Sequence, residues 1–118
     1  MEANATSRFN PVSARKARLV ADVVRGLSVE KAVHALALMP KKAAPIIQKT
    51  ILSAVANARQ SGNAGSLNED DFVVSEIKVD EGPTQKRIRA RAQGRAFRIR
   101  KRTSHVKVTV RADAGDDE

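Results

Sequence analysis

The sequence predicts an α+β protein, in which three helices are followed by two strands that flank a long basic hairpin. Apolar residues recur at helical spacing in three segments before residue 61, and β-branched residues alternate in two segments after residue 71. The basic stretch lies between these two strands. With 118 residues the chain is expected to form a single domain (1–118) with one modest core.

Residues that favour helix ends define the first two helices. Ser13 caps the first helix and Gly26 ends it. Ser28 caps the second, which ends near Met39 because Pro40 follows. Three cations lie in the opening turns of the first helix, where the helix dipole favours anions: Arg15, Lys16 and Arg18. Either a bound phosphate or the solvent offsets this arrangement, and both alternatives stay open here.

The third helix follows Lys41 and Lys42, tolerates Pro45 in its first turn and ends at Gln60. Its body is unusually apolar, so the helix should lie at the centre of the fold. Residues 61–68 are rich in Gly, Ser and Asn and form a connecting loop.

Two strands are predicted at residues 72–79 and 104–110, and residues 6–9 are a candidate third strand at the sheet edge. In the first strand, alternation puts four residues on one face: Val73, Ser75, Ile77 and Val79. In the second it does so for Val106, Val108 and Val110. If these strands pair antiparallel, the residues between them continue both strands as a hairpin that reverses near Gln93.

Residues 82–112 contain no acid and eleven cations. They are Lys86, Arg87, Arg89, Arg91, Arg95, Arg98, Arg100, Lys101, Arg102, Lys107 and Arg111. The whole chain has a formal charge of +9, so everything outside this block sums to −2. Such segregated charge marks the part of the molecule that meets a polyanion.

The hairpin should project from the body. Each of its arms has about ten residues and reaches roughly 30 Å, about the width of the body. A reversal at Ala92 and Gln93 places Arg87 opposite Arg98, and a reversal at Gln93 and Gly94 places Arg87 opposite Arg100. Both registers oppose like charges, so the tip is expected to be mobile until phosphates enter between the cations.

Nucleic acid suits this block better than a membrane does. Eight of the eleven cations are arginine, which binds phosphate bidentately. Large apolar residues between Lys86 and Arg102 are few, whereas a membrane-active ribbon would interleave many. A thin cationic finger fits between RNA helices. Aromatic residues make up 3% of the chain, so base stacking is not expected as the main mode.

Several other function classes are disfavoured. The first eight residues lack an apolar signal region and no run of 18 apolar residues exists, so neither export nor a membrane span is expected. The absence of cysteine fits a reducing cytoplasm.

An enzyme is not expected either. His34 and His105 are far apart, and Ser104 cannot form a dyad with His105 because adjacent strand residues point to opposite faces. Three adjacent acids make a poor metal cage, so no metal and no cofactor are predicted: Glu69, Asp70 and Asp71.

Three runs resemble the family of bacterial large-subunit ribosomal protein 22: DEGPTQKRIRARAQGRAFRIRKRTSH (residues 80–105), VSARKARLVADVVRG and PKKAAPIIQKTILSAVANA. The likeness covers about residues 8–111. It implies three helices packed on a small three-stranded antiparallel sheet, with a long protruding β-hairpin at residues 80–105 that binds 23S rRNA. It also implies that the body lies near the outer opening of the nascent-peptide exit tunnel.

The resemblance further implies that the hairpin bridges rRNA segments and lines the tunnel close to ribosomal protein 4. Expected partners are therefore 23S rRNA, neighbouring large-subunit proteins and the nascent peptide, in the cytoplasm, without homo-oligomers. A role in subunit assembly and a link to macrolide sensitivity are implied as well. The alternative is a nucleoid or other DNA-architectural protein that uses the same ribbon in a groove.

Site residues follow by position. The rRNA-binding residues are Arg15, Lys16, Arg18, Lys41, Lys42, Lys86, Arg87, Arg89, Arg91, Arg95, Arg98, Arg100, Lys101 and Arg102. The tunnel-lining tip is Arg89, Ala90, Arg91, Ala92, Gln93, Gly94 and Arg95, and the macrolide-linked arm is Gln85, Lys86 and Arg87. Two departures from the family stand out: Ala90 replaces a common proline, and an acidic tail at residues 113–118, expected to be disordered, has no general counterpart.

Overall fold

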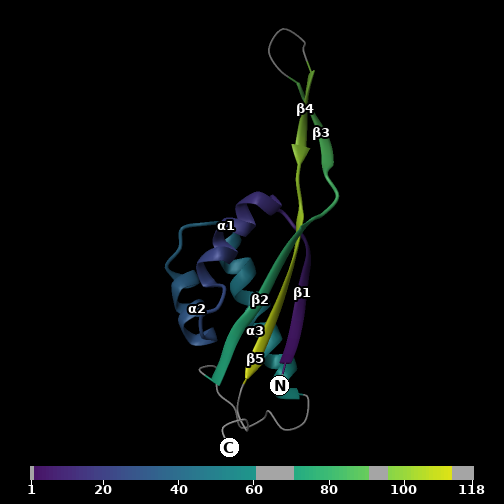
Figure 1. Cartoon of the computed structure of the whole chain (residues 1–118). Helices are drawn as coiled ribbons and strands as arrows, with labels where there is room; N and C mark the ends of the chain where they lie inside the picture. The colour runs from purple at the N-terminus through teal and green to yellow at the C-terminus, as the bar shows by residue number, and fades with distance from the viewer. Residues whose placement is uncertain (1, 61–70, 91–95, 113–118) are drawn as a thin grey trace, which may run out of the picture.

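The computed structural model describes residues 2–60, 71–90 and 96–112, with the backbone alone for residues 85–90 and 96–101. The molecule measures 72 × 25 × 16 Å, because a two-stranded arm extends far beyond a body of helices and strands (Figure 1). The predicted α+β class is confirmed. The predicted loop at 61–68, the hairpin reversal and the acidic tail lie outside the described residues.

Three helices form the first half, as predicted: α1 (Ala14–Val24), α2 (Val29–Ala37) and α3 (Ala43–Gln60). Both predicted caps are present. The Ser13 hydroxyl accepts a hydrogen bond from the Lys16 N–H, and the Ser28 hydroxyl accepts one from the Lys31 N–H. The second helix ends slightly earlier than predicted, at Ala37, with Leu38 as its C-cap.

The body sheet has three antiparallel strands in the order β1-β5-β2: β1 (Glu2–Asn10), β2 (Phe72–Glu81) and β5 (Ser104–Ala112). The two strands that flank the basic hairpin pair with each other, as predicted, and Val108 pairs with both Ala5 and Ile77. The third strand exists at the predicted edge, but it is longer than residues 6–9 because it pairs with β5 along most of its length.

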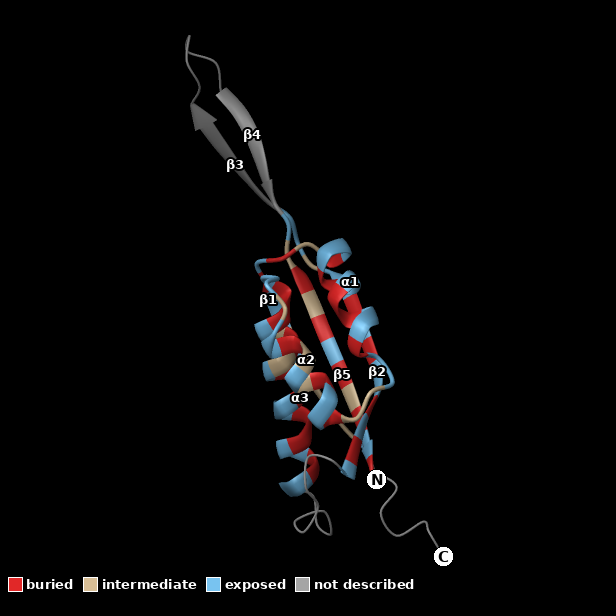
Figure 2. Cartoon of the chain, turned by 90° about the vertical axis from the view of Figure 1, so that its left-hand side faces the viewer, coloured by how far each residue is buried: buried red, intermediate tan, exposed pale blue. Residues whose placement is uncertain are grey.

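Helices cover one face of this sheet. Along β5, Val106, Val108 and Val110 are fully buried, as predicted, while the intervening residues are half-buried or exposed. The central helix α3 lies against β1 and β5, and α1 lies against β2. Figure 2 shows buried positions on both the helices and the strands of the body. The core is aliphatic apart from Phe72.

The prediction that Val73, Ser75, Ile77 and Val79 share one face of the strand was wrong. Ile77 and Val79 are buried but Val73 and Ser75 are exposed, and Phe72 and Val74 are buried in their place. The pairing of β2 with β5 shifts between Val74 and Glu76, which marks a bulge at Ser75. One extra residue reverses the alternation that follows it, so a strict period of two fails there.

The outer edge of β2 is contacted by the connection between α1 and α2. Val74 exchanges two backbone hydrogen bonds of 2.9 Å, one with Gly26 and one with Leu27. Gly26 has a φ of +87°, a conformation that glycine adopts without strain. Further along the edge, Arg25 Nη2 donates to the Ile77 carbonyl at 2.9 Å. These contacts occupy part of the edge and leave fewer backbone groups free for strand pairing.

The arm consists of β3 (Gln85–Ala90) and β4 (Ala96–Lys101), which form a separate antiparallel sheet. Both predicted registers were wrong: Arg87 pairs with Ile99, between the two expected partners. The pairing of Ala90 with Ala96 leaves five residues for the reversal, whereas both predictions assumed two. An odd number of connecting residues shifts every pair by one position.

This shift changes what the cations oppose. Arg87 no longer opposes a cation, Ile88 lies opposite Arg98 and Arg89 opposite Phe97, while Lys86 lies opposite Arg100. The like-charged pair expected at Arg87 is thus replaced by a pair of a cation with an apolar residue.

The arm does not continue the body strands directly. Residues 82–84 and 102–103, here called the neck, belong to no strand. Pro83 has no backbone N–H to offer to a ladder. Two hydrogen bonds close the neck instead: Gly82 N–H donates to the Thr103 carbonyl at 2.9 Å, and Thr103 Oγ1 donates to the Pro83 carbonyl at 2.7 Å.

Candidate nucleic-acid interface

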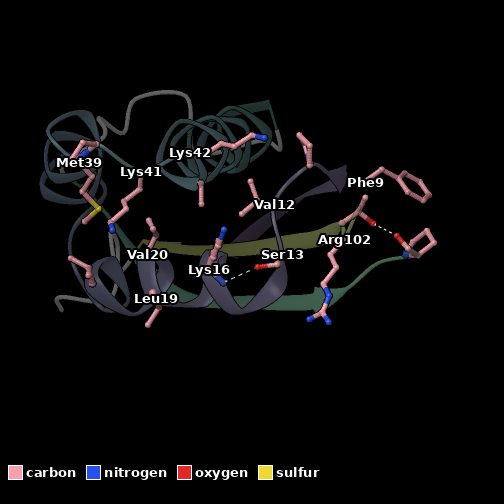
Figure 3. Close-up of a pocket in the computed structure, with 16 residues that line it drawn as sticks. Phe9, Val12, Ser13, Lys16, Leu19, Val20, Met39, Lys41, Lys42 and Arg102 are labelled. Carbon is pink, nitrogen blue, oxygen red and sulfur yellow. Dashed lines mark hydrogen bonds between the residues drawn. The ribbon is translucent and has the colours of Figure 1, made fainter. Parts of the chain in front are cut away.

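A groove lies at the foot of the arm, on the body side of the neck (Figure 3). It is lined by the segment before α1, one face of α1, the connection between α2 and α3, and the neck. Its volume is about 1220 Å³, larger than the roughly 300–1,000 Å³ of a typical small-molecule site. The size favours a macromolecular partner.

Four cations predicted to bind RNA line this groove: Lys16, Lys41, Lys42 and Arg102. They come from α1, the α2–α3 connection and the neck, and all are exposed. The described residues that line the groove include no acid, so nothing within it neutralises these charges. The fold therefore gathers on one surface cations that are up to 86 positions apart in the sequence.

Apolar side chains lie among these cations. Phe9, Leu19 and Val23 are 62%, 66% and 54% exposed and line the same groove. Exposure of large apolar side chains to water is unfavourable, so a partner that covers them binds more tightly because it buries them. The groove thus offers charge for phosphates and apolar area for sugars or bases.

Arg15 lines a smaller hollow of about 450 Å³ beside the neck, together with Arg102 and Glu81. Arg102 lines both hollows, so it joins the groove to the root of the arm. The carboxylate of Glu81 lines this hollow, so the hollow is less positive than the groove.

Arg18 has a structural partner that the sequence did not indicate. Its Nε and Nη2 atoms donate to the Val79 carbonyl at 3.2 and 2.9 Å, at the outer edge of β2. Arg25, seven residues later on the same helix face, makes the equivalent bond to Ile77 and an ion pair with Asp22. Sequence reasoning missed Arg25, because nothing local shows that an edge strand lies within reach of the helix.

Phe9 and His105 form a second feature that sequence reasoning missed. The Phe9 N–H donates to His105 Nδ1 at 3.0 Å, and the two rings meet edge to face with centroids 4.9 Å apart. Phe9 has a φ of +57°, in the left-handed region that non-glycine residues rarely adopt. The adjacent Asn10 is buried and donates to the carbonyls of Ser7 and Ser104. His105 is therefore engaged with β1 rather than with Ser104.

The remaining predicted RNA-binding residues lie along the arm. Six are in the described strands: Lys86, Arg87, Arg89, Arg98, Arg100 and Lys101. Arg91 and Arg95, with most of the predicted tip, lie outside the described residues. The three residues predicted to form the macrolide-linked arm, Gln85, Lys86 and Arg87, open β3.

Other candidate sites receive no support from the described part of the chain. His34 is exposed on α2. No group of three or more metal-ligating side chains occurs among residues 2–60, 71–90 and 96–112. Within those same residues, no helix has both the length and the apolar character needed to cross a membrane.

An α+β body with a long basic arm and a cationic groove is typical of proteins that bind polyanions. The family model described as ribosomal protein L22p/L17e matches residues 5–111. The large ribosomal subunit protein uL22 of Maridesulfovibrio salexigens is 50% identical over 111 residues, which cover 94% of this chain and 98% of that protein. The chain belongs to the L22p/L17e family of ribosomal proteins.

Membership in this family confirms the predicted resemblance. The chain is a structural constituent of the large ribosomal subunit, works in translation in the cytoplasm, and is not an enzyme. The DNA-architectural alternative is disfavoured by the same finding.

Proposed function

We propose that this protein binds 23S rRNA through its arm and groove, and that the arm bridges rRNA segments that are distant from one another. The observation that carries this proposal is the projection of a two-stranded arm from residues 82–112, a block with eleven cations and no acid. The molecule is 72 Å long but only 25 Å wide, so the arm reaches phosphates that the body cannot touch. Binding replaces counterions and needs no catalytic group.

The groove supplies the second contact. Lys16, Lys41 and Lys42 meet phosphates at the foot of the arm, and Arg102 continues the path into the neck. Arg15 adds a cation beside the neck. One RNA surface that follows this path contacts the body and the arm together, which fixes the direction in which the arm points.

Within the ribosome, family membership supports a position for the arm in the nascent-peptide exit tunnel. The tip, residues 89–95, lines the tunnel near ribosomal protein 4 and faces the nascent peptide. Residues 85–87 form the macrolide-linked part of the arm. The protein acts early in subunit assembly, because an arm that crosses between rRNA segments holds them together as they fold.

The chain acts as a single domain in which the body provides the stable fold and the hairpin provides the RNA contacts. The buried core lies in the body, whereas residues 80–105 form the RNA-binding hairpin. Residues 113–118 are acidic and lie outside the described residues, and no function is proposed for them.

A salt series tests the RNA contact. Filter binding to 23S rRNA fragments should show log affinity falling with log salt; the block alone contributes a slope of about −4 to −5 if half of its eleven cations engage phosphates, and the cations of the groove make the slope steeper. The double variant Lys41→Gln, Lys42→Gln should reduce the slope by about 2. Lys49→Gln, on an exposed part of α3 outside the groove, is the matched control. A wild-type slope near zero contradicts the proposal, and equal affinity for duplex DNA supports the DNA-architectural alternative.

The absence of cysteine allows a direct test of the tunnel position. Gln93→Cys, incorporated into large subunits, should cross-link to ribosomal protein 4 or to a stalled nascent peptide. Ser53→Cys, exposed on the body helix α3, is the control and should not. Equal cross-linking from both positions contradicts a tip that lies inside the tunnel.

A further inference from the structure

We propose that Phe9, held against His105 at the foot of the arm, is a stacking site for an unpaired base of the bound RNA. This inference rests on the proposed RNA binding and adds to it a contact that is not ionic. Phe72, the other phenylalanine whose side chain the structure describes, is fully buried in the core. Phe9 is 62% exposed, so its ring contributes little to the packing of the body.

The backbone at Phe9 is held in a conformation that disfavours its own residue type. A φ of +57° is easy for glycine and unfavourable for a residue with a Cβ. Strain of this kind persists where the surroundings enforce it, and it concentrates at binding sites. The register break in β1 between Ser7 and Asn10 produces this conformation, and buried Asn10 fixes the next residue.

His105 orients the exposed ring. Its Nδ1 accepts the Phe9 N–H at 3.0 Å, and its own ring meets the Phe9 ring at an interplanar angle of 90°. The aromatic ring therefore has a defined direction before any ligand arrives. Such preorganisation lowers the entropy that binding must overcome. His105 acts as a positioning residue in this arrangement.

The surroundings of Phe9 match a nucleotide. Figure 3 shows Phe9 and Arg102 at the same end of the groove, away from Leu19 and Met39. Arg102 and Lys16 are exposed cations that line the groove with Phe9, and the described lining contains no acid. An aromatic face beside cations is the usual combination by which proteins hold single-stranded nucleic acid. An unpaired base stacks on the ring while its phosphate meets Arg102.

Fluorescence tests this site directly, because the chain contains neither tryptophan nor tyrosine. Phe9→Trp introduces a single reporter that keeps an aromatic face. Its emission should be quenched on addition of 23S rRNA fragments. Leu38→Trp, at a position that is 74% exposed and does not line the groove, is the matched control and should be quenched much less. Equal quenching at both positions overturns the proposal.

Affinity provides an independent readout. Phe9→Gly removes the ring while favouring the backbone conformation already present, so the body should stay folded. Affinity for the rRNA fragments should fall about 5- to 150-fold, with the salt slope unchanged, because stacking releases no counterion. Phe9→Trp should retain affinity, whereas Phe9→Leu should lose it despite its similar size. Leu38→Ala should bind as the wild type does.

The outcomes separate the two proposals. If the wild type fails to bind rRNA with a steep salt slope, the proposed function is wrong. If the wild type binds and Phe9→Gly binds equally well, RNA binding stands and the stacking site is wrong. If Phe9→Gly binds RNA normally but fails to enter large subunits, Phe9 contacts a neighbouring protein, and the stacking site is again overturned.

Discussion

Gly82 lies so close to Thr103 that a Cβ added to the glycine would stand 2.5 Å from Thr103 Oγ1. The same hydroxyl donates to the Pro83 carbonyl, and Gly82 itself donates to the Thr103 carbonyl. The two segments of the neck can approach this closely because residue 82 has no side chain. Because the arm leaves the body here, this contact controls how firmly the arm is joined to it.

We expect Gly82→Ala to loosen the neck. The added methyl group displaces Thr103 and breaks its bond to Pro83, at a cost of about 1 kcal/mol. Thermal unfolding should show a fall in Tm of roughly 3–5 °C for a chain of this size.

A double-mutant cycle checks the cause of this effect. Thr103→Ala removes the clashing oxygen, so Gly82→Ala should cost clearly less in that background than in the wild type. If Gly82→Ala lowers the stability equally in both backgrounds, then contact with Thr103 is not the reason that residue 82 must be glycine.

We expect Arg15 and Arg18, both in α1, to differ in their effects. Arg18→Gln removes two hydrogen bonds to the Val79 carbonyl, so it should lower the free energy of unfolding by about 1 kcal/mol, measured in urea. Arg15→Gln should leave unfolding unchanged and reduce the salt slope of rRNA binding by about 1. The reverse pattern would show that Arg18 is the RNA contact and Arg15 the structural residue.

Asn10→Ala should be among the more damaging single changes in the body. Asn10 is buried, donates to the carbonyls of Ser7 and Ser104, and accepts from the Ser7 hydroxyl. Leaving these groups without a partner should cost about 2 kcal/mol in the free energy of unfolding. Asn57→Ala, which removes an exposed bond to the Asn4 carbonyl, is the control and should cost under about 0.5 kcal/mol. Similar losses for both variants would contradict a special role for Asn10.

The body should fold without the arm. The body has a buried core of its own, made by residues of its three helices and three strands, so replacing residues 85–101 by a short Asn-Gly turn should change Tm by only a few degrees. The salt slope for rRNA should fall to roughly half. A variant that fails to show a cooperative unfolding transition would show that the arm contributes to the stability of the body.

The sequence was sufficient for features that depend on local chemistry. Ser13 and Ser28 cap helices because their hydroxyls accept from amides only three residues ahead. The alternating valines of β5 face the core because no bulge interrupts that strand along Val106, Val108 and Val110.

Features that depend on pairing across the chain could not be predicted in this way. The bulge at Ser75 is visible only from the pairing of β2 with β5, and the arm register depends on the number of residues in the reversal. The groove depends on packing that brings Lys16, Lys42 and Arg102 together. Phe9 was overlooked because its importance rests on a positive φ and on a partner 96 positions away.

The covered edge of β2 also bears on the time between synthesis and incorporation into the ribosome. A newly made copy, free of RNA, exists beside many identical copies, and an open strand edge would let them add to one another's sheets. Arg18, Arg25 and the backbone of Gly26 occupy carbonyls along that edge from within the same chain. The carbonyls of Val74, Ile77 and Val79 are therefore not free to pair with a strand of another copy while the protein awaits its RNA partner.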